Sequence, residues 1–165
     1  MRLQTLKKAL NEMVSILLNN QNIAKLVYWD NTDALTSKEM LPPAETLLQD
    51  GYISVFPKDA SGISQNKVNT MISIIPDTFS FEEKSTEMTG NIYISTTVNL
   101  LNLNDNKFRL LELIDNIVDS LNKKKLSGSI ILKLRSAVFD ISTNFRIGYS
   151  ISFTLIDQVN TKAVI

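Results

Sequence analysis

The chain has 165 residues, enough for one domain with a hydrophobic core and too few for two comfortable ones. Hydrophobic residues make up 44% of it, as in ordinary globular proteins, which argues against disorder along the whole chain. Lys and Arg total 17 and Asp and Glu total 17, so the formal net charge is zero. The chain therefore lacks the basic excess that is typical of proteins that bind nucleic acid.

The chain contains neither cysteine nor histidine. Disulfides, thiolate metal sites and cysteine nucleophiles are thereby excluded, and the commonest general base and metal ligand is missing. We therefore expect no enzymatic activity, no catalytic residues, no cofactor and no metal site, although carboxylate-only or lysine-based catalysis stays open. There is also no run of about 20 apolar residues, so we expect no membrane insertion and synthesis in a cytoplasm.

The first segment has the periodicity of an amphipathic helix. Apolar residues recur at spacings of three and four, and they are Leu3, Leu6, Leu10, Met13, Val14 and Leu17. The Asn19-Asn20 pair predicts the end of this helix. A second apolar patch over residues 23–29 predicts one or two further helical turns.

Residues 30–66 carry the signals of loops, with one short helix and one extended piece among them. Pro42-Pro43 excludes a helix centred there, although Ala44 can begin one after it. Ile53 to Phe56 then leads into Pro57, which predicts a short extended piece at a sheet edge.

Alternation and β-branched residues predict two strands next. The first runs from Val68 to Ile75 and ends at Pro76, and the second covers residues 91–100. The polar stretch between them, residues 77–89, is predicted to be a long loop.

The clearest helix follows, with Asp105 as its predicted N-cap. Its predicted apolar stripe consists of Leu110, Leu111, Ile114, Ile117, Val118 and Leu121. Two alternating strands complete the chain, over residues 130–135 and 145–155, with a turn predicted at 140–144.

The order of elements is helix, loop, strand, strand, helix, strand, strand. It predicts an α+β fold in which a mainly antiparallel sheet of about four strands carries helices packed on one face. We expect residues 1–157 to form a single domain and residues 158–165 to be a flexible C-terminal tail.

Three clusters of charged side chains have both a structural and a functional interpretation. They are Asp30 with Asp33, then Glu82 and Glu83 with Glu87, and finally Lys123 to Lys125. The first could ligate calcium, but it lacks the glycine and terminal glutamate of an EF-hand loop, so a plain turn is favoured. The second could be an acid–base pair and the third a phosphate contact. A solvated loop and a charged helix end are the favoured alternatives.

Partner binding has better candidates than catalysis. Phe79 and Phe81 alternate in the predicted loop beside Glu82, Glu83 and Lys84, where exposed aromatic rings would suit a protein interface. The alternative, that both rings fold back onto the sheet, is weighed equally. Tyr28 and Trp29, the latter the only tryptophan, are also interface candidates, although anchoring in the core is favoured for them.

Several segments resemble tail-terminator (head-to-tail joining) proteins of tailed bacteriophages. They are the N-terminal helix leading into NQNIAKLVYWDNTDAL, then GYISVFPKD, NTMISIIPD, NIYISTTVNL, NKFRLLELIDNIVDSL and FRIGYSISFTLID. Together they cover most of residues 3–157.

The resemblance implies a structural virion protein in the tail-neck region, assembled in the host cytoplasm. Such a protein forms a homo-oligomeric ring, in this family a hexamer, that caps the tail tube, ends its growth and joins the tail to the head connector or stopper protein. Its expected partners are copies of itself, the tube protein and the connector. Sequence-specific nucleic-acid binding is not expected, although the ring lumen leaves room for DNA to pass.

Two alternatives stay open. The chain could be another neck component, such as a head-completion or connector adaptor protein, although those are more helical. It could also be a non-viral adaptor domain that binds one cellular partner and stays monomeric with it.

Overall fold

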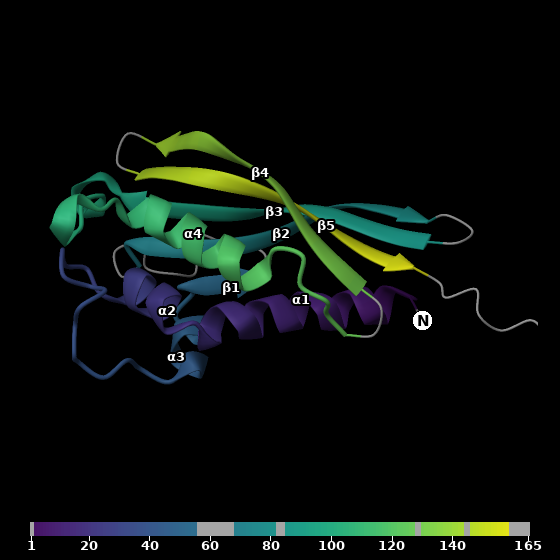
Figure 1. The fold of residues 1–165 in the computed structure, drawn as a ribbon, viewed down its shortest axis with the longest axis horizontal. Helices are drawn as coiled ribbons and strands as arrows, with labels where there is room; N and C mark the ends of the chain where they lie inside the picture. Colours follow the sequence, from purple (N-terminus) through teal and green to yellow (C-terminus); the bar gives the residue numbers. More distant parts are fainter. Residues whose placement is uncertain (1, 56–67, 82–84, 128–129, 144–145, 159–165) are drawn as a thin grey trace, which may run out of the picture.

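The computed structural model describes residues 2–55, 68–81, 85–127, 130–143 and 146–158. A sheet forms one layer and the helices cover one of its faces (Figure 1). The helices are α1 (Arg2–Asn19), α2 (Gln21–Tyr28), α3 (Ala44–Gln49) and α4 (Arg109–Leu121), with short 3-10 turns η1 (Val98–Leu100) and η2 (Asn104–Asn106). The strands are β1 (Ile53–Val55), β2 (Thr70–Phe81), β3 (Ser85–Thr97), β4 (Ile130–Thr143) and β5 (Arg146–Gln158).

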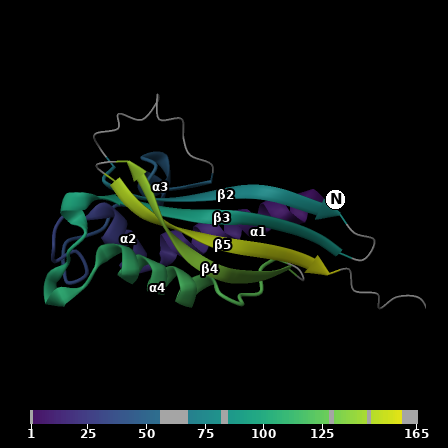
Figure 2. The same ribbon diagram turned by 90° about the horizontal axis from the view of Figure 1, so that it is seen from above.

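The sheet has five strands in the order β1-β2-β3-β5-β4. Strand β1 runs parallel to β2, and every other neighbouring pair is antiparallel. The predicted α+β class with a mainly antiparallel sheet and helices on one face is confirmed (Figures 1 and 2). The strand count is five rather than about four, because the extended piece predicted near residue 53 joins the sheet as its short parallel edge.

The N-terminal helices follow the predicted pattern. All the predicted stripe residues of α1 except Leu3 are buried. The Asn19-Asn20 pair ends α1, and Asn20 begins α2 as its N-cap, since its side-chain oxygen accepts a hydrogen bond from the Ile23 amide at 3.1 Å. Farther back in α1, the Glu12 carboxylate accepts hydrogen bonds from the amide and hydroxyl of Ser127, which ties α1 to the segment before β4.

The core lies between the sheet and the helices. Along β3, every second residue faces the helices and is buried, among them Met88, Ile92 and Ile94. Gly90 lies in this row opposite Phe153 of β5, and a Cβ there would come within 2.6 Å of the Phe153 ring. The glycine thus leaves the space into which that ring packs.

Strands β2 and β3 form a hairpin where the sequence predicted a loop. Strand β2 does not end at Pro76 but continues to Phe81, and β3 begins at Ser85, so the predicted loop over residues 77–89 is wrong. The pairing register shifts between Pro76 and Phe79. Proline is tolerated there because β1 pairs only with residues 72–74 of β2, which leaves the later part of β2 as an edge among the described residues.

The helix α4 begins later than predicted. Asp105 is not its N-cap: it lies inside η2 with a left-handed backbone (φ 63°), and the helix starts after Phe108. Strand β3 also ends at Thr97, so Val98 and Leu100 belong to η1 rather than to a strand. The polar residues before α4 are used for this tight turn, and the helix begins without a side-chain cap.

The buried face of α4 differs in part from the predicted stripe. Leu110, Ile117 and Leu121 are buried as predicted, but Leu111 is 47% exposed, and Leu113 takes its place in the core. The helix ends at Leu121, so Lys123 to Lys125 follow the helix instead of lying in its last turn.

Strands β4 and β5 form a second long hairpin, and both are longer than predicted. Strand β4 continues to Thr143, so most of the turn predicted at residues 140–144 is strand. Strand β5 continues to Gln158, the first residue of the predicted tail, and residues 159–165 lie outside the described residues. None of the described helices is both long and apolar enough to span a membrane.

One buried arginine joins four separate segments at the end of the sheet where α2 and α4 meet. The Arg109 guanidinium donates hydrogen bonds to the backbone carbonyls of Leu26 at 2.5 Å, Trp29 at 2.9 Å and Asn31 at 2.6 Å, and its Nε donates to the Leu100 carbonyl at 2.9 Å. The side chain is fully buried. Burial lowers the pKa of this guanidinium from its ordinary value, and the Asp30 carboxylate opposes the shift.

We predict that Arg109→Met destabilises the fold by about 3 kcal/mol or more, because the substitution leaves buried carbonyls at the end of α2 without a donor. Urea unfolding followed by circular dichroism measures this loss. Arg135→Met is the matched control, since Arg135 is exposed and donates one hydrogen bond, to Thr154 at 3.1 Å, so it should cost less than about 1 kcal/mol. Equal losses in the two variants would contradict the role assigned to Arg109.

Candidate protein-interaction surfaces

The β2–β3 hairpin presents Phe79 and Phe81 at one end of the molecule. Their exposed fractions are 42% and 62%. They pair with Met88 and Thr86, which are buried, so both rings lie on the helix-side face of the sheet. They remain exposed because β2 has no strand beside it at these positions in the described part of the chain. We call these two residues the hairpin patch.

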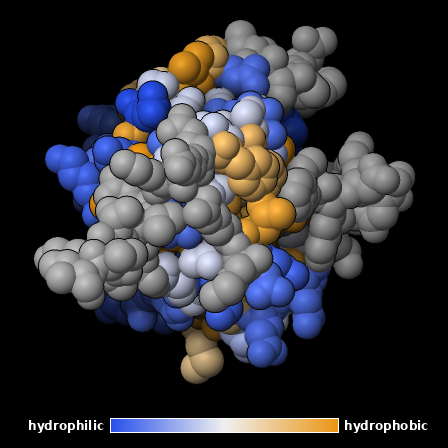
Figure 3. Space-filling view, turned by 90° about the vertical axis from the view of Figure 1, so that its right-hand side faces the viewer, coloured by the Kyte–Doolittle hydropathy of each residue, from blue (hydrophilic) through white to orange (hydrophobic). Residues whose placement is uncertain are grey.

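Figure 3 shows the end of the molecule that lies at the right of Figure 1, where β2 and β5 end and β3 and α1 begin. A group of hydrophobic side chains is exposed near the middle of this end. Exposed apolar side chains of this kind suit contact with another protein. Of the predicted neighbours, Glu82, Glu83 and Lys84 lie outside the described residues.

Tyr28 and Trp29 lie at the opposite end of the molecule from the hairpin patch, at the end of α2. Both are partly buried against the core. The Tyr28 ring meets the Trp29 ring edge-on at a centroid distance of 4.7 Å and lies 5.6 Å from the ring of Tyr52. Burial raises the pKa of the Tyr52 hydroxyl, and the Tyr28 hydroxyl adds to the shift. This ring packing is typical of anchoring in the core, although the buried Nε1 of Trp29 has no hydrogen-bond partner among the described residues.

The face of the sheet that lies away from the helices is covered by no helix that the structure describes (Figure 2). Tyr93, Ser150 and Val138 lie side by side across β3, β5 and β4 on this face. Small polar residues dominate β5 here, as the sequence predicted, and Ser150 donates to the Asn91 side chain at 3.3 Å. We call this surface the open face.

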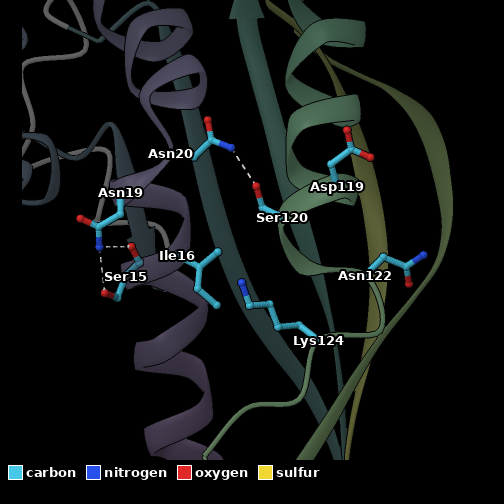
Figure 4. A pocket seen from close by; sticks show the side chains of 8 residues that line it. All are labelled: Ser15, Ile16, Asn19, Asn20, Asp119, Ser120, Asn122 and Lys124. Atoms are coloured by element: carbon cyan, nitrogen blue, oxygen red, sulfur yellow. Dashed lines mark hydrogen bonds between the residues drawn. The ribbon is translucent and has the colours of Figure 1, made fainter.

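A polar groove runs between α1 and α4. Its volume is about 430 Å³, and Figure 4 shows Ile16 of α1 and Lys124, which follows α4, pointing into the space between the helices. Asn20 donates a hydrogen bond to the Ser120 hydroxyl at 2.8 Å across one end of the groove. The amide and hydroxyl groups that line the groove thus bond largely to protein, and Asp119 and Lys124 also line it.

An apolar groove lies on the other side of α1. Its volume is about 460 Å³, and its apolar lining comes from Val14 and Leu18 of α1, Ala44 and Leu48 of α3, and Val55 of β1. Leu48 is 40% exposed. Such a groove suits an apolar side chain from another protein surface.

Of the charged clusters weighed in the sequence, Asp30 with Asp33 and Lys123 to Lys125 lie in the described part of the chain, whereas Glu82 and Glu83 lie outside it. The Asp30 carboxylate accepts a hydrogen bond from the Asn69 amide group at 2.5 Å, and the Asp33 carbonyl closes a turn with Thr36 and Ser37. Over the described residues, no three acidic side chains lie close enough to hold a metal ion.

Sequence reasoning missed two arginines that organise the structure. Besides Arg109, the half-buried Arg146 donates to the carbonyls of Val68 and Asn69, both at 3.1 Å, and burial lowers its pKa. Nothing in the sequence around Arg146 predicts its structural role. The role of Arg109 could have been suspected, since a cation in the first turn of a helix is unfavourable for the helix dipole unless it has a tertiary partner.

Comparison with known families identifies the chain. The YomW family model matches residues 20–155, which is more than half of the sequence. The chain belongs to the YomW family. This family is phage-derived, so the protein is of a phage type.

Other comparisons add little. No curated protein matches the chain. Among solved structures, the core region of PilO from the type IV pilus system of Pseudomonas aeruginosa is similar over 58% of this chain and 85% of that chain, with 10% sequence identity and a TM-score of 0.34. A likeness this weak carries no argument about fold or function.

We predict that Phe79→Ser with Phe81→Ser leaves the YomW-family fold intact and weakens self-assembly or partner binding at least tenfold (about 1.4 kcal/mol) if the hairpin patch is an interface. Circular dichroism checks folding, and analytical ultracentrifugation checks association. Met40→Ser is the control, because Met40 is 92% exposed and lies in a loop far along the chain from the hairpin. Loss of folded protein in the double variant would assign the rings to the core instead.

Proposed function

We propose that this YomW-family protein is a structural component of a phage tail that caps the tail tube as a ring, ends tube growth and joins the tail to the head connector. The observation that carries the proposal is the match to a phage-derived family over residues 20–155. It agrees with the resemblance to tail-terminator proteins found in the separate segments of the sequence.

The surfaces of the described residues support a protein that works by assembly. A ring needs contacts between unlike surfaces of neighbouring copies, and a cap needs a further surface for the tube. The hairpin patch, the open face and the apolar groove are three separate surfaces that could meet these needs. A net charge of zero also limits repulsion between copies.

The ring is tested by negative-stain electron microscopy and mass photometry of the purified protein at rising concentration. We expect closed rings with an open lumen and a mass of six times 18.5 kDa, about 111 kDa. A protein that stays monomeric at every concentration, and also with its partner, would favour the alternative of a non-viral adaptor domain.

Tube capping needs a separate test, because a ring is not yet a cap. Tail-tube protein is polymerised in vitro with increasing amounts of this protein, and tube lengths are measured by electron microscopy. We expect shorter tubes with density at one end. Tubes of unchanged length with no terminal density would contradict the proposed function, and binding to isolated head connectors alone would favour another neck component.

A further inference from the structure

Two helices carry exposed charges of opposite sign. Helix α1 has Lys7 and Lys8 in its N-terminal half. Helix α4 has Asp115 and Asp119 towards its C-terminal end. Lys7, Lys8 and Asp115 lie outside the first and last turns, where the helix dipole acts, so interaction with the dipoles of their own helices does not account for them.

The acidic residues of α4 lie on its outermost face together with an exposed leucine. Leu111, Asp115 and Asp119 recur at a spacing of four, which places them in one stripe opposite the buried face. Glu112 flanks the stripe and pairs with Lys107 at 3.5 Å. No ion pair within the described residues engages Asp115 or Asp119. We call Leu111, Asp115 and Asp119 the α4 stripe.

The apolar groove offers the complementary surface. Val14 and Leu18 line it. Lys7 lies on the same flank of α1, one turn before Asn11 and two turns before Val14, and Lys8 is beside it. Both lysines are exposed. The groove thus joins an apolar part around Leu18 and Leu48 to a basic part at the N-terminal end of α1.

Helix α1 lies between the apolar groove and the α4 stripe, since Ser15 and Asn19 of α1 line both the apolar groove and the polar groove that Asp119 borders. The groove adjoins β1, at one edge of the sheet, whereas α4 packs towards β4, at the other edge. Figure 2 shows α3 and α4 on opposite sides of the helical layer. One copy therefore cannot bring its own stripe to its own groove, but a second copy can, and repetition of this unlike contact gives a ring when the rotation closes.

The lengths of the two surfaces agree when the helices run antiparallel. Leu111 and Asp119 are separated by about 12 Å along α4, and Leu18 and Lys8 by about 15 Å along α1. With Leu111 over the apolar part near Leu48, the Asp115 and Asp119 carboxylates come to the basic part, and the flexible lysine side chains cover the remaining distance.

We infer that the apolar groove of one copy receives the α4 stripe of a second copy of this chain. Leu111 fills the apolar part, and Asp115 and Asp119 face Lys7 and Lys8. The closure of this contact into a ring rests on the proposed function, but the contact itself does not.

Charge reversal tests the ionic half of the contact. Asp115→Lys with Asp119→Lys, and separately Lys7→Glu with Lys8→Glu, should each weaken association at least about tenfold, because each places like charges face to face. An equal mixture of the two variants should associate again, since each then meets an oppositely charged partner. Circular dichroism checks that each variant is folded, since Lys8→Glu also places a like charge four residues before Glu12. The control, Lys38→Glu with Glu39→Lys, changes exposed loop charges only and should have no effect.

Engineered disulfides test the apolar half, and the absence of native cysteine makes the readout clean. A chain with Leu48→Cys and Leu111→Cys should give covalent multimers after mild oxidation on a non-reducing denaturing gel. Leu111→Cys with Met40→Cys should remain monomeric, as should each single variant. Dimers from Leu111→Cys alone would overturn the proposal in favour of an α4–α4 contact.

The outcomes separate this contact from the proposed function. Multimers of the unmodified chain that neither charge reversal nor the cysteine pair affects would overturn the groove contact and leave the ring standing. A monomer with no cross-linked product at any concentration would also overturn it. Cross-linked multimers that fail to shorten tail tubes would instead support the contact and contradict tube capping.

Discussion

The arrangement of the helical layer depends on the buried guanidinium of Arg109. Four carbonyls from α2, the following loop and η1 converge on it, and the same residue begins α4. Because burying a charge is costly unless all its hydrogen bonds are made, the guanidinium stabilises only one relative position of these segments. The orientation of α4, and with it the direction in which its acidic stripe faces, follows from this set of bonds.

The two long hairpins extend the sheet beyond the area that the helices cover. Phe79 and Phe81 at the end of β2 and Phe139 near the end of β4 all lie on the helix-side face and yet are exposed. The Phe139 ring meets the ring of Tyr149 at 5.3 Å, so it is only partly sheltered. Extended hairpins with uncovered aromatic rings give a small protein more surface for neighbours than a compact shape of the same mass.

The sequence predicted correctly the helices and strands that depend on hydrophobic periodicity. It failed where a contact between residues far apart in the chain determines where an element begins or ends. The α1 stripe and the alternation of β5 were readable because one face of each is buried along its whole length. Asp105 was predicted as the N-cap of α4 but lies in a turn, because residues that favour helix N-caps also favour turns. The helix begins instead at Arg109, whose hydrogen bonds to distant carbonyls fix that position. Pro76 was misjudged because the edge position of β2 depends on the shortness of β1. Of the residues proposed here for interfaces, only the aromatic ones could be found from the sequence, since Leu111 looks like a core residue until the orientation of α4 is known.

A net charge of zero conceals a separation of charge over the surface. Exposed Lys7 and Lys8 lie in the N-terminal half of α1, and exposed Asp115 and Asp119 lie towards the end of α4. No ion pair within the described residues engages Asp115 or Asp119. The proposed contact between unlike surfaces of two identical copies would bring the two pairs together, and in a head-to-tail assembly each copy supplies both.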